Sequence, residues 1–267
     1  MNDTLAAILL GIVEGITEYL PVSSTGHLIL ASELLGYNAQ KWALFNVVIQ
    51  PGAILAIIVL YWRTFWQVLT GLFSLEAGAV AFVRNILLAF IPAVVLGLAF
   101  SDVIDLLLEN AVVVAWALII GGVAILLVER FALPIEVGGV AALSVKQSVM
   151  IGLVQCLAMV PGVSRSGATI LGAMSFGVDR KTAAEFSFFL AVPTLTGATA
   201  LQLFKHGGAL SVADLDLFAI GFVVSFVVAL IVIKAFLGIV TRYGFAPFAW
   251  YRIVAGVAAL IWLGPFG

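Results

Sequence analysis

Residues 14–27 read EGITEYLPVSSTGH, and residues 161–169 read PGVSRSGAT. Each of these polar stretches interrupts a longer apolar run, the first at residues 5–36 and the second at residues 146–177. A helix that spans a membrane needs about 20 mostly apolar residues, and each interrupted run leaves two half-length helices around a turn. Because irregular backbone at membrane depth must be buried in protein or line a cavity, the two runs predict two re-entrant helical hairpins.

The composition indicates that the rest of the chain is also embedded in lipid. Of its 267 residues, 64% are hydrophobic and 10% are charged, against about 25% charged in an ordinary soluble domain. The same length criterion finds six spanning helices, at about residues 43–62, 84–100, 111–129, 184–204, 217–237 and 247–264. The sequence therefore predicts an all-α integral membrane protein with six transmembrane helices and two re-entrant helical hairpins.

The two hairpins resemble each other in sequence. At one constant offset, glycines and a serine of the first run align with those of the second: Gly11 with Gly152, Ser23 with Ser164 and Gly26 with Gly167. Three spans follow each hairpin, so the halves at about residues 5–130 and 146–264 cross the membrane in opposite directions. We therefore expect a single membrane domain with an inverted-topology repeat, whose hairpins meet near the midplane.

Loop charges indicate the orientation of this topology. Two cations, Lys41 and Lys205, lie on one side, and nine lie on or near the other: Arg63, Arg84, Arg130, Lys146, Arg180, Lys181, Lys234, Arg242 and Arg252. Cytoplasmic loops carry the excess of Lys and Arg, so the first hairpin is expected to open to the outer face. The amino end is acidic and lacks a small-residue cleavage site, so we interpret it as a retained segment rather than a signal peptide.

Two carboxylates lie on one face of the first half-helix. Glu14 and Glu18 are four residues apart, which places them one helical turn from each other. Two like charges so close repel, so one takes up a proton or a cation lies between them. Calcium and magnesium both prefer carboxylate oxygens, and these two residues are therefore the predicted metal ligands. The alternative is that both side chains extend to the membrane–water interface.

The first turn has the residue types of an anion site. Pro21 ends the first half-helix, and the free N–H groups at the start of the second form a positive dipole end. Its predicted phosphate-binding residues are Ser23, Thr25 and Gly26. Ser24 and His27 are three residues apart, an arrangement for nucleophilic attack assisted by a base. The competing interpretation is a helix-capping hydroxyl beside a core histidine.

The second turn adds a cation to this site. Arg165 stands at the midpoint of an apolar run, and its planar guanidinium matches a phosphate. The phosphate-binding residues predicted around it are Ser164, Ser166, Gly167 and Thr169. The alternative to phosphate binding is that Arg165 forms a purely structural salt bridge with Glu14 or Glu18. Together the two turns predict a phosphate or diphosphate ligand within the membrane.

Two classes of function are excluded. The 12 basic and 14 acidic residues give a net charge of −2, and no basic stretch is present to follow a nucleic acid. The single cysteine, Cys156, excludes an internal disulfide and a multi-thiolate metal site.

The two quoted stretches resemble the signature motifs of the bacterial undecaprenyl-diphosphatases, also called bacitracin-resistance proteins, and the resemblance covers nearly the whole chain. It implies hydrolysis of undecaprenyl diphosphate to undecaprenyl phosphate and inorganic phosphate in the bacterial cytoplasmic (inner) membrane, which recycles the lipid carrier of peptidoglycan synthesis. It implies a divalent cation, Ca²⁺ or Mg²⁺, as cofactor. By this resemblance the site residues are Glu14, Glu18, Ser24, His27, Arg165 and the hydroxyls of the second motif.

The sequence leaves the mechanism and one competing function open. In our first hypothesis Ser24 attacks the terminal phosphorus and His27 takes its proton, and in the second His27 is itself the nucleophile. The competing function is transport or flipping of a lipid phosphate through the same anion site, since inverted repeats are typical of transporters. The lipid substrate and membrane lipids are the expected partners, and a homodimer is an open alternative to a monomer.

Overall fold

The structure is a computed structural model that describes residues 2–34, 39–108, 110–132, 138–206 and 214–264. Within these ranges the chain is helical and has no β-strand. In chain order the elements are α1 (Asp3–Thr17), α2 (Ser24–Leu34), α3 (Ala39–Leu60), α4 (Trp62–Phe73), α5 (Ala77–Ala99), α6 (Ser101–Leu108), α7 (Ala111–Phe131), the short 3-10 helix η1 (Val140–Ala142), α8 (Val145–Gln155), the 3-10 helix η2 (Cys156–Met159), α9 (Arg165–Ser175), α10 (Arg180–His206), α11 (Leu215–Tyr243) and α12 (Ala246–Leu263). The predicted all-α class is confirmed.

Five of the described helices are long and apolar enough to cross a membrane, namely α5, α7, α10, α11 and α12. They coincide with five of the six predicted spans. The sixth prediction, residues 43–62, falls on α3, which is followed by α4 after a bend of 74°. Tyr61 lies at this bend in a non-helical conformation. The pair α3 and α4 counts as a sixth candidate span if it is taken as one broken helix.

Both interrupted runs fold as two short helices around a turn. We call α1 and α2 with the turn at residues 18–23 the first hairpin, and α8, η2 and α9 with the turn at residues 160–164 the second hairpin. The two helices of each hairpin pack against each other. The predicted end of the first run at Gly36 lies outside the described residues.

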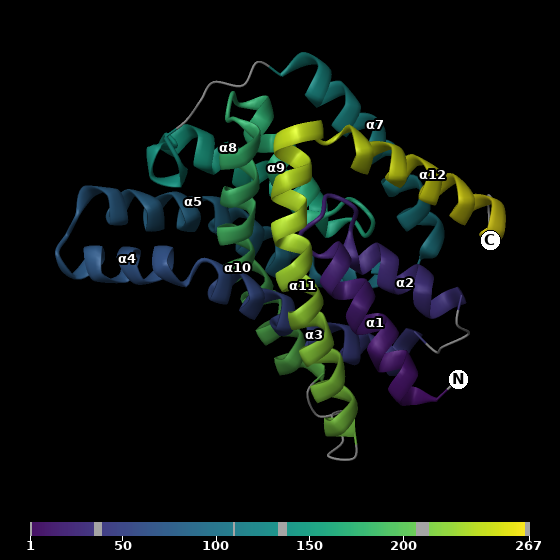
Figure 1. The fold of residues 1–267 in the computed structure, drawn as a ribbon. Coiled ribbons are helices and arrows are strands. Elements are labelled where there is room, and N and C mark those ends of the chain that lie inside the picture. Colours follow the sequence, from purple (N-terminus) through teal and green to yellow (C-terminus); the bar gives the residue numbers. More distant parts are fainter. Residues whose placement is uncertain (1, 35–38, 109, 133–137, 207–213, 265–267) are drawn as a thin grey trace.

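Helix packing repeats between the two halves (Figure 1). The helix α1 packs along α11, and the corresponding α8 packs along α5; likewise α3 packs on α11 and α10 packs on α5. Gly11 and Gly152 lie in these contacts. A Cβ atom on Gly11 would come within 2.8 Å of the Gly221 carbonyl oxygen, and one on Gly152 within 2.5 Å of that of Ala89. The absence of a side chain at both glycines thus lets the helix backbones approach closely.

An aromatic core supports the first turn. Tyr19 is fully buried, and its hydroxyl donates to the Ala53 carbonyl oxygen at 2.8 Å. Its ring meets that of Phe188 edge to face, with the centroids 5.4 Å apart. Such ring pairs contribute about 1 kcal/mol beyond the area they bury. The residue that follows Glu18 is therefore anchored to α3 and α10.

Candidate active site

The two turns start their helices in the same way. Ser23 and Ser164 both have left-handed backbone conformations, with φ of 72° and 79°. Their hydroxyl oxygens accept from the backbone N–H of Gly26 at 3.3 Å and of Gly167 at 3.0 Å. Left-handed backbone is costly for a residue with a side chain, and such strain is concentrated at functional sites. Both predicted helix starts are thus capped by serines at aligned positions.

The two turns lie directly against each other. The Ser166 hydroxyl of the second hairpin donates to the Leu20 carbonyl oxygen of the first at 2.7 Å. A Cβ atom on Gly26 would come within 3.2 Å of the Cα atom of Gly162. The N-termini of α2 and α9, which are the positive ends of the two helix dipoles, therefore lie in one region formed by both hairpins.

Glu18 connects the predicted nucleophile to the predicted phosphate-binding cation. One oxygen of its buried carboxylate accepts a hydrogen bond from the Ser24 hydroxyl. The other forms an ion pair with Nη2 of Arg165 at 2.8 Å. The salt bridge that the sequence left as an alternative for Arg165 is thus present, and it lies inside the predicted site.

Ser187 of α10 completes the surroundings of Arg165. Its carbonyl oxygen and hydroxyl accept from Nη1 of Arg165 at 2.9 and 3.1 Å, and its hydroxyl also accepts from Thr169 at 2.8 Å. The Nε–H of Arg165 is buried and has no hydrogen-bond partner among the described residues. Ser187 is not among the residues predicted from the sequence, because a single serine within an apolar span carries no spacing signal.

Glu14 is fully buried, with 0% of its surface exposed. Neither of its carboxylate oxygens has a hydrogen-bond partner within the described ranges. A buried carboxylate without partners is costly, and a cation is one way to satisfy it. The described residues contain no group of three or more His, Cys, Asp and Glu side chains that could hold a metal. A cation at Glu14 and Glu18 would therefore take its remaining ligands from water or substrate, as magnesium commonly does.

His27 does not contact Ser24 through a hydrogen bond. Its Nδ1 lies 2.8 Å from the Ser23 carbonyl oxygen, and its Nε2 lies 2.8 Å from the hydroxyl oxygen of Tyr251. The hydrogen-bond acceptor for the Ser24 hydroxyl is Glu18. The predicted serine and histidine thus both lie in the first helical turn of α2, but each has a different hydrogen-bond partner.

Arg252, which the sequence analysis placed with the cations on or near the cytoplasmic side, is buried in the protein with 1% exposure. Its guanidinium donates to Pro21 O at 2.8 Å in the first turn, and to Gly162 O and Val163 O, both at 2.9 Å, in the second. It also donates to two carbonyl oxygens of α7. Because a charged residue near the start of a terminal span resembles an interfacial cation, the sequence did not reveal this role.

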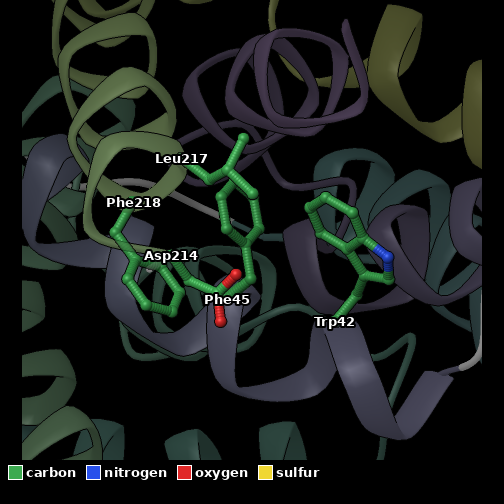
Figure 2. A pocket seen from close by; sticks show the side chains of 5 residues that line it. All are labelled: Trp42, Phe45, Asp214, Leu217 and Phe218. Atoms are coloured by element: carbon green, nitrogen blue, oxygen red, sulfur yellow. The ribbon is translucent and has the colours of Figure 1, made fainter. Parts of the chain in front are cut away.

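Thr25 lies in the first turn of α2 and is partly exposed. A cavity of about 40 Å³ lies between α3 and the start of α11. Its lining side chains are Trp42, Phe45, Asp214, Leu217 and Phe218 (Figure 2). None of the predicted site residues lines it, so this cavity is separate from the hairpin site.

Comparisons with known proteins agree with the signature motifs. The family described as "Bacitracin resistance protein BacA" matches residues 7–258. Similar proteins include the undecaprenyl-diphosphatase of Novosphingobium aromaticivorans, which is 59% identical over 98% of this chain and 99% of its own length. Those of Sphingopyxis alaskensis and Rhizorhabdus wittichii are 55% identical (98% of this chain, 99% of the relative) and 56% identical (97% of each). The chain belongs to the bacitracin resistance protein BacA family.

Proposed function

We propose that this chain hydrolyses undecaprenyl diphosphate to undecaprenyl phosphate and inorganic phosphate. Membership of the BacA family and the names of the relatives support this activity, and they give no support to the transporter. The single observation that carries the proposal within the structure is the position of Glu18. Its carboxylate accepts from Ser24 and pairs with Arg165, so it brings a nucleophile and a phosphate-binding cation together in a buried site.

In the first step the Ser24 oxygen attacks the terminal phosphorus, and its proton passes to the Glu18 carboxylate that already accepts it. The new Oγ–P bond forms while the bond from that phosphorus to the bridging oxygen breaks, and the electron pair leaves with undecaprenyl phosphate. A hydroxyl paired with an adjacent base is an activated nucleophile. This assignment replaces His27 by Glu18 as the base for Ser24.

In the second step water attacks the phosphoserine. A new O–P bond forms and the Oγ–P bond breaks, so inorganic phosphate leaves and Glu18 returns its proton to Ser24. The attacking water must lose a proton, and we assign this proton to His27 at the start of α2. General base catalysis of this kind contributes about 10²–10⁴-fold to a rate.

Binding of the diphosphate is assigned to the two helix starts and to Arg165. The unpartnered Nε–H of Arg165 is a donor that a phosphate oxygen can satisfy. The backbone N–H groups at the start of α2 and α9 add donors aimed at an anion. Since charge spreads over the phosphate oxygens in the transition state, these fixed donors stabilise it without reorganisation.

A divalent cation fits the acidic end of this site. Glu14 and Glu18 would hold it, because Glu14 is buried with both oxygens unpartnered. When bound, such an ion neutralises charge on the phosphate oxygens. Glu18 also keeps its contacts with Ser24 and Arg165 in the structure, so Glu14 is the residue with free coordination capacity.

The proposed membrane arrangement has six spans and two re-entrant hairpins in an inverted repeat, in the bacterial cytoplasmic membrane. The repeated packing of α1 on α11 and α8 on α5 supports the repeat, and the loop cations support a first hairpin that opens to the periplasm.

Single cysteines introduced in a Cys156→Ser background can test this orientation. An impermeant thiol reagent should label Asp102→Cys in whole cells and Lys146→Cys only after lysis. The reverse pattern would overturn the orientation.

Phosphate release from undecaprenyl diphosphate by the detergent-purified protein tests the activity. We expect release that stops with EDTA and disappears in Arg165→Ala, whereas the exposed Arg242→Ala should retain it. Lipid binding without release by the wild-type protein would favour the transporter. A quenched single turnover then identifies the nucleophile: an acid-stable phosphoenzyme indicates Ser24, an acid-labile one indicates His27, and none indicates direct attack by water.

A further inference from the structure

The hydrogen-bond partners of His27 determine which of its nitrogens is an acceptor. The Ser23 carbonyl oxygen, 2.8 Å from Nδ1, can only accept, so Nδ1 carries a hydrogen. In the neutral imidazole Nε2 then has the lone pair. The Tyr251 hydroxyl, 2.8 Å away, therefore donates to Nε2. Nε2 is the nitrogen that can act as a base, and Tyr251 is its hydrogen-bond partner.

Tyr251 also restrains the imidazole ring itself. The two rings are nearly parallel, with an interplanar angle of 12° and centroids 5.6 Å apart. Tyr251 comes from α12 and is 224 residues away along the chain. The next residue, Arg252, bonds the carbonyl oxygens of both turns, so the backbone that carries Tyr251 is tied to the backbone that carries His27. With 49% of its surface exposed, Tyr251 lies at the outer edge of this arrangement.

We propose that Tyr251 is a positioning residue for His27. Its hydroxyl and ring hold the imidazole with Nε2 as the acceptor, at the edge of the first turn rather than on the Ser24 hydroxyl. The proposal rests on the proposed function, in which Glu18 is the base for Ser24 and His27 is the base for the water of the second step. Nε2 has a single lone pair, so in that step the water takes the position that the Tyr251 hydroxyl holds in the structure. Tyr251 then affects hydrolysis of the phosphoserine and acts only through His27.

Kinetics of four proteins test this dependence: the wild type, Tyr251→Phe, His27→Ala and the double variant. Phenylalanine keeps the stacked ring and removes the hydroxyl. We expect Tyr251→Phe to lower kcat about tenfold, which is the lower end of the 10–100-fold range for partners that orient metal-bound histidines. The double variant should match His27→Ala, because a residue that acts through another has no effect in its absence. In single turnovers Tyr251→Phe should accumulate phosphoenzyme, since only its decay is slowed.

A spectroscopic readout and a matched control complete the test. The chain has two histidines, so ¹⁵N-histidine labelling with His206→Gln as an assignment variant isolates the His27 nitrogens. The Nε2 resonance should move in Tyr251→Phe, and it should stay in place in Tyr243→Phe, which alters another exposed tyrosine.

Additive losses in the double variant, equal slowing of phosphoenzyme formation and decay, or an unchanged Nε2 resonance would each overturn the role of Tyr251. If His27→Ala is fully active while Arg165→Ala is inactive, this inference fails and the proposed hydrolytic site stands. If both variants are fully active, the proposed site itself is wrong.

Discussion

Glu18 and Arg165 are 147 residues apart in the chain, and their side chains form an ion pair at 2.8 Å. The carboxylate comes from the first hairpin and the guanidinium from the second. Buried ion pairs of this kind contribute little net stability, because desolvation offsets the attraction, but losing one partner costs about 3–5 kcal/mol. The pair therefore joins the two halves at the point where the reaction is proposed to occur.

The Glu18 carboxylate should be essential for the rate. Glu18→Gln keeps the size of the side chain and its capacity to accept from Ser24, but it removes the base. We expect kcat to fall by about 10²–10⁴-fold, the usual contribution of a general base. Phosphate release at saturating substrate measures the change. The matched control is Glu33→Gln, at an exposed position on α2. A Glu18→Gln protein with more than a tenth of wild-type kcat would contradict the role of Glu18 as the base.

Arg252 should stabilise the fold through its five N–H donors. Arg252→Lys keeps the charge but has at most three donors, so at least two of the five carbonyl oxygens lose their partner. An unsatisfied buried polar group costs about 1–3 kcal/mol, so the melting temperature in detergent should fall by roughly 5 °C or more. Arg242→Lys, at an exposed position, should leave it unchanged. An equal melting temperature for both variants would show that the contacts of Arg252 contribute nothing.

The dependence of activity on the cation should change most when Glu14 is replaced. After chelation and readdition of Mg²⁺ or Ca²⁺, we expect Glu14→Gln to need a cation concentration at least about tenfold higher for half-maximal activity, because one of two carboxylate ligands is lost. Calorimetric titration of the cation into the protein measures the same change without the reaction. Glu76→Gln, at the exposed residue that precedes α5, should have the cation dependence of the wild type. Identical cation dependence in Glu14→Gln and wild type would remove Glu14 from the metal site.

Gly11 and Gly152 should be equivalent in their effect on stability. An added Cβ would meet a backbone carbonyl oxygen at 2.8 Å in the first case and 2.5 Å in the second, so each alanine variant must push two helices apart. Overpacking of this kind costs about 1–3 kcal/mol. We expect both melting temperatures to fall, while Gly238→Ala, with nothing within 4 Å of its added Cβ, should not change. A loss in only one of the two variants would argue against equivalent roles in an inverted repeat.

The apolar helices, the two breaks and the residues that begin the second helix of each hairpin could all be predicted from the amino-acid sequence. These features depend on neighbours within a few residues. Pro21 cannot continue a helix, Ser23 and Ser164 cap the helix that follows them, and 64% hydrophobic residues leave too few charges for a water-facing surface. Local chemistry of this kind can be predicted without knowledge of packing.

Which side chains meet depends on how the helices pack against one another in three dimensions. In the folded protein the Ser24 hydroxyl donates to Glu18 and not to His27. The helices α10 and α12 add Ser187, Tyr251 and Arg252 to the surroundings of the hairpins. These partners are single residues within apolar helices, and their side chains reach the hairpins because of how α10 and α12 pack. A hydrogen bond across 224 or 231 residues, as for His27 with Tyr251 or Arg252 with Pro21, has no local signal. Such contacts form because a polar group inside an apolar protein must be satisfied by whatever donor or acceptor the packing brings to it.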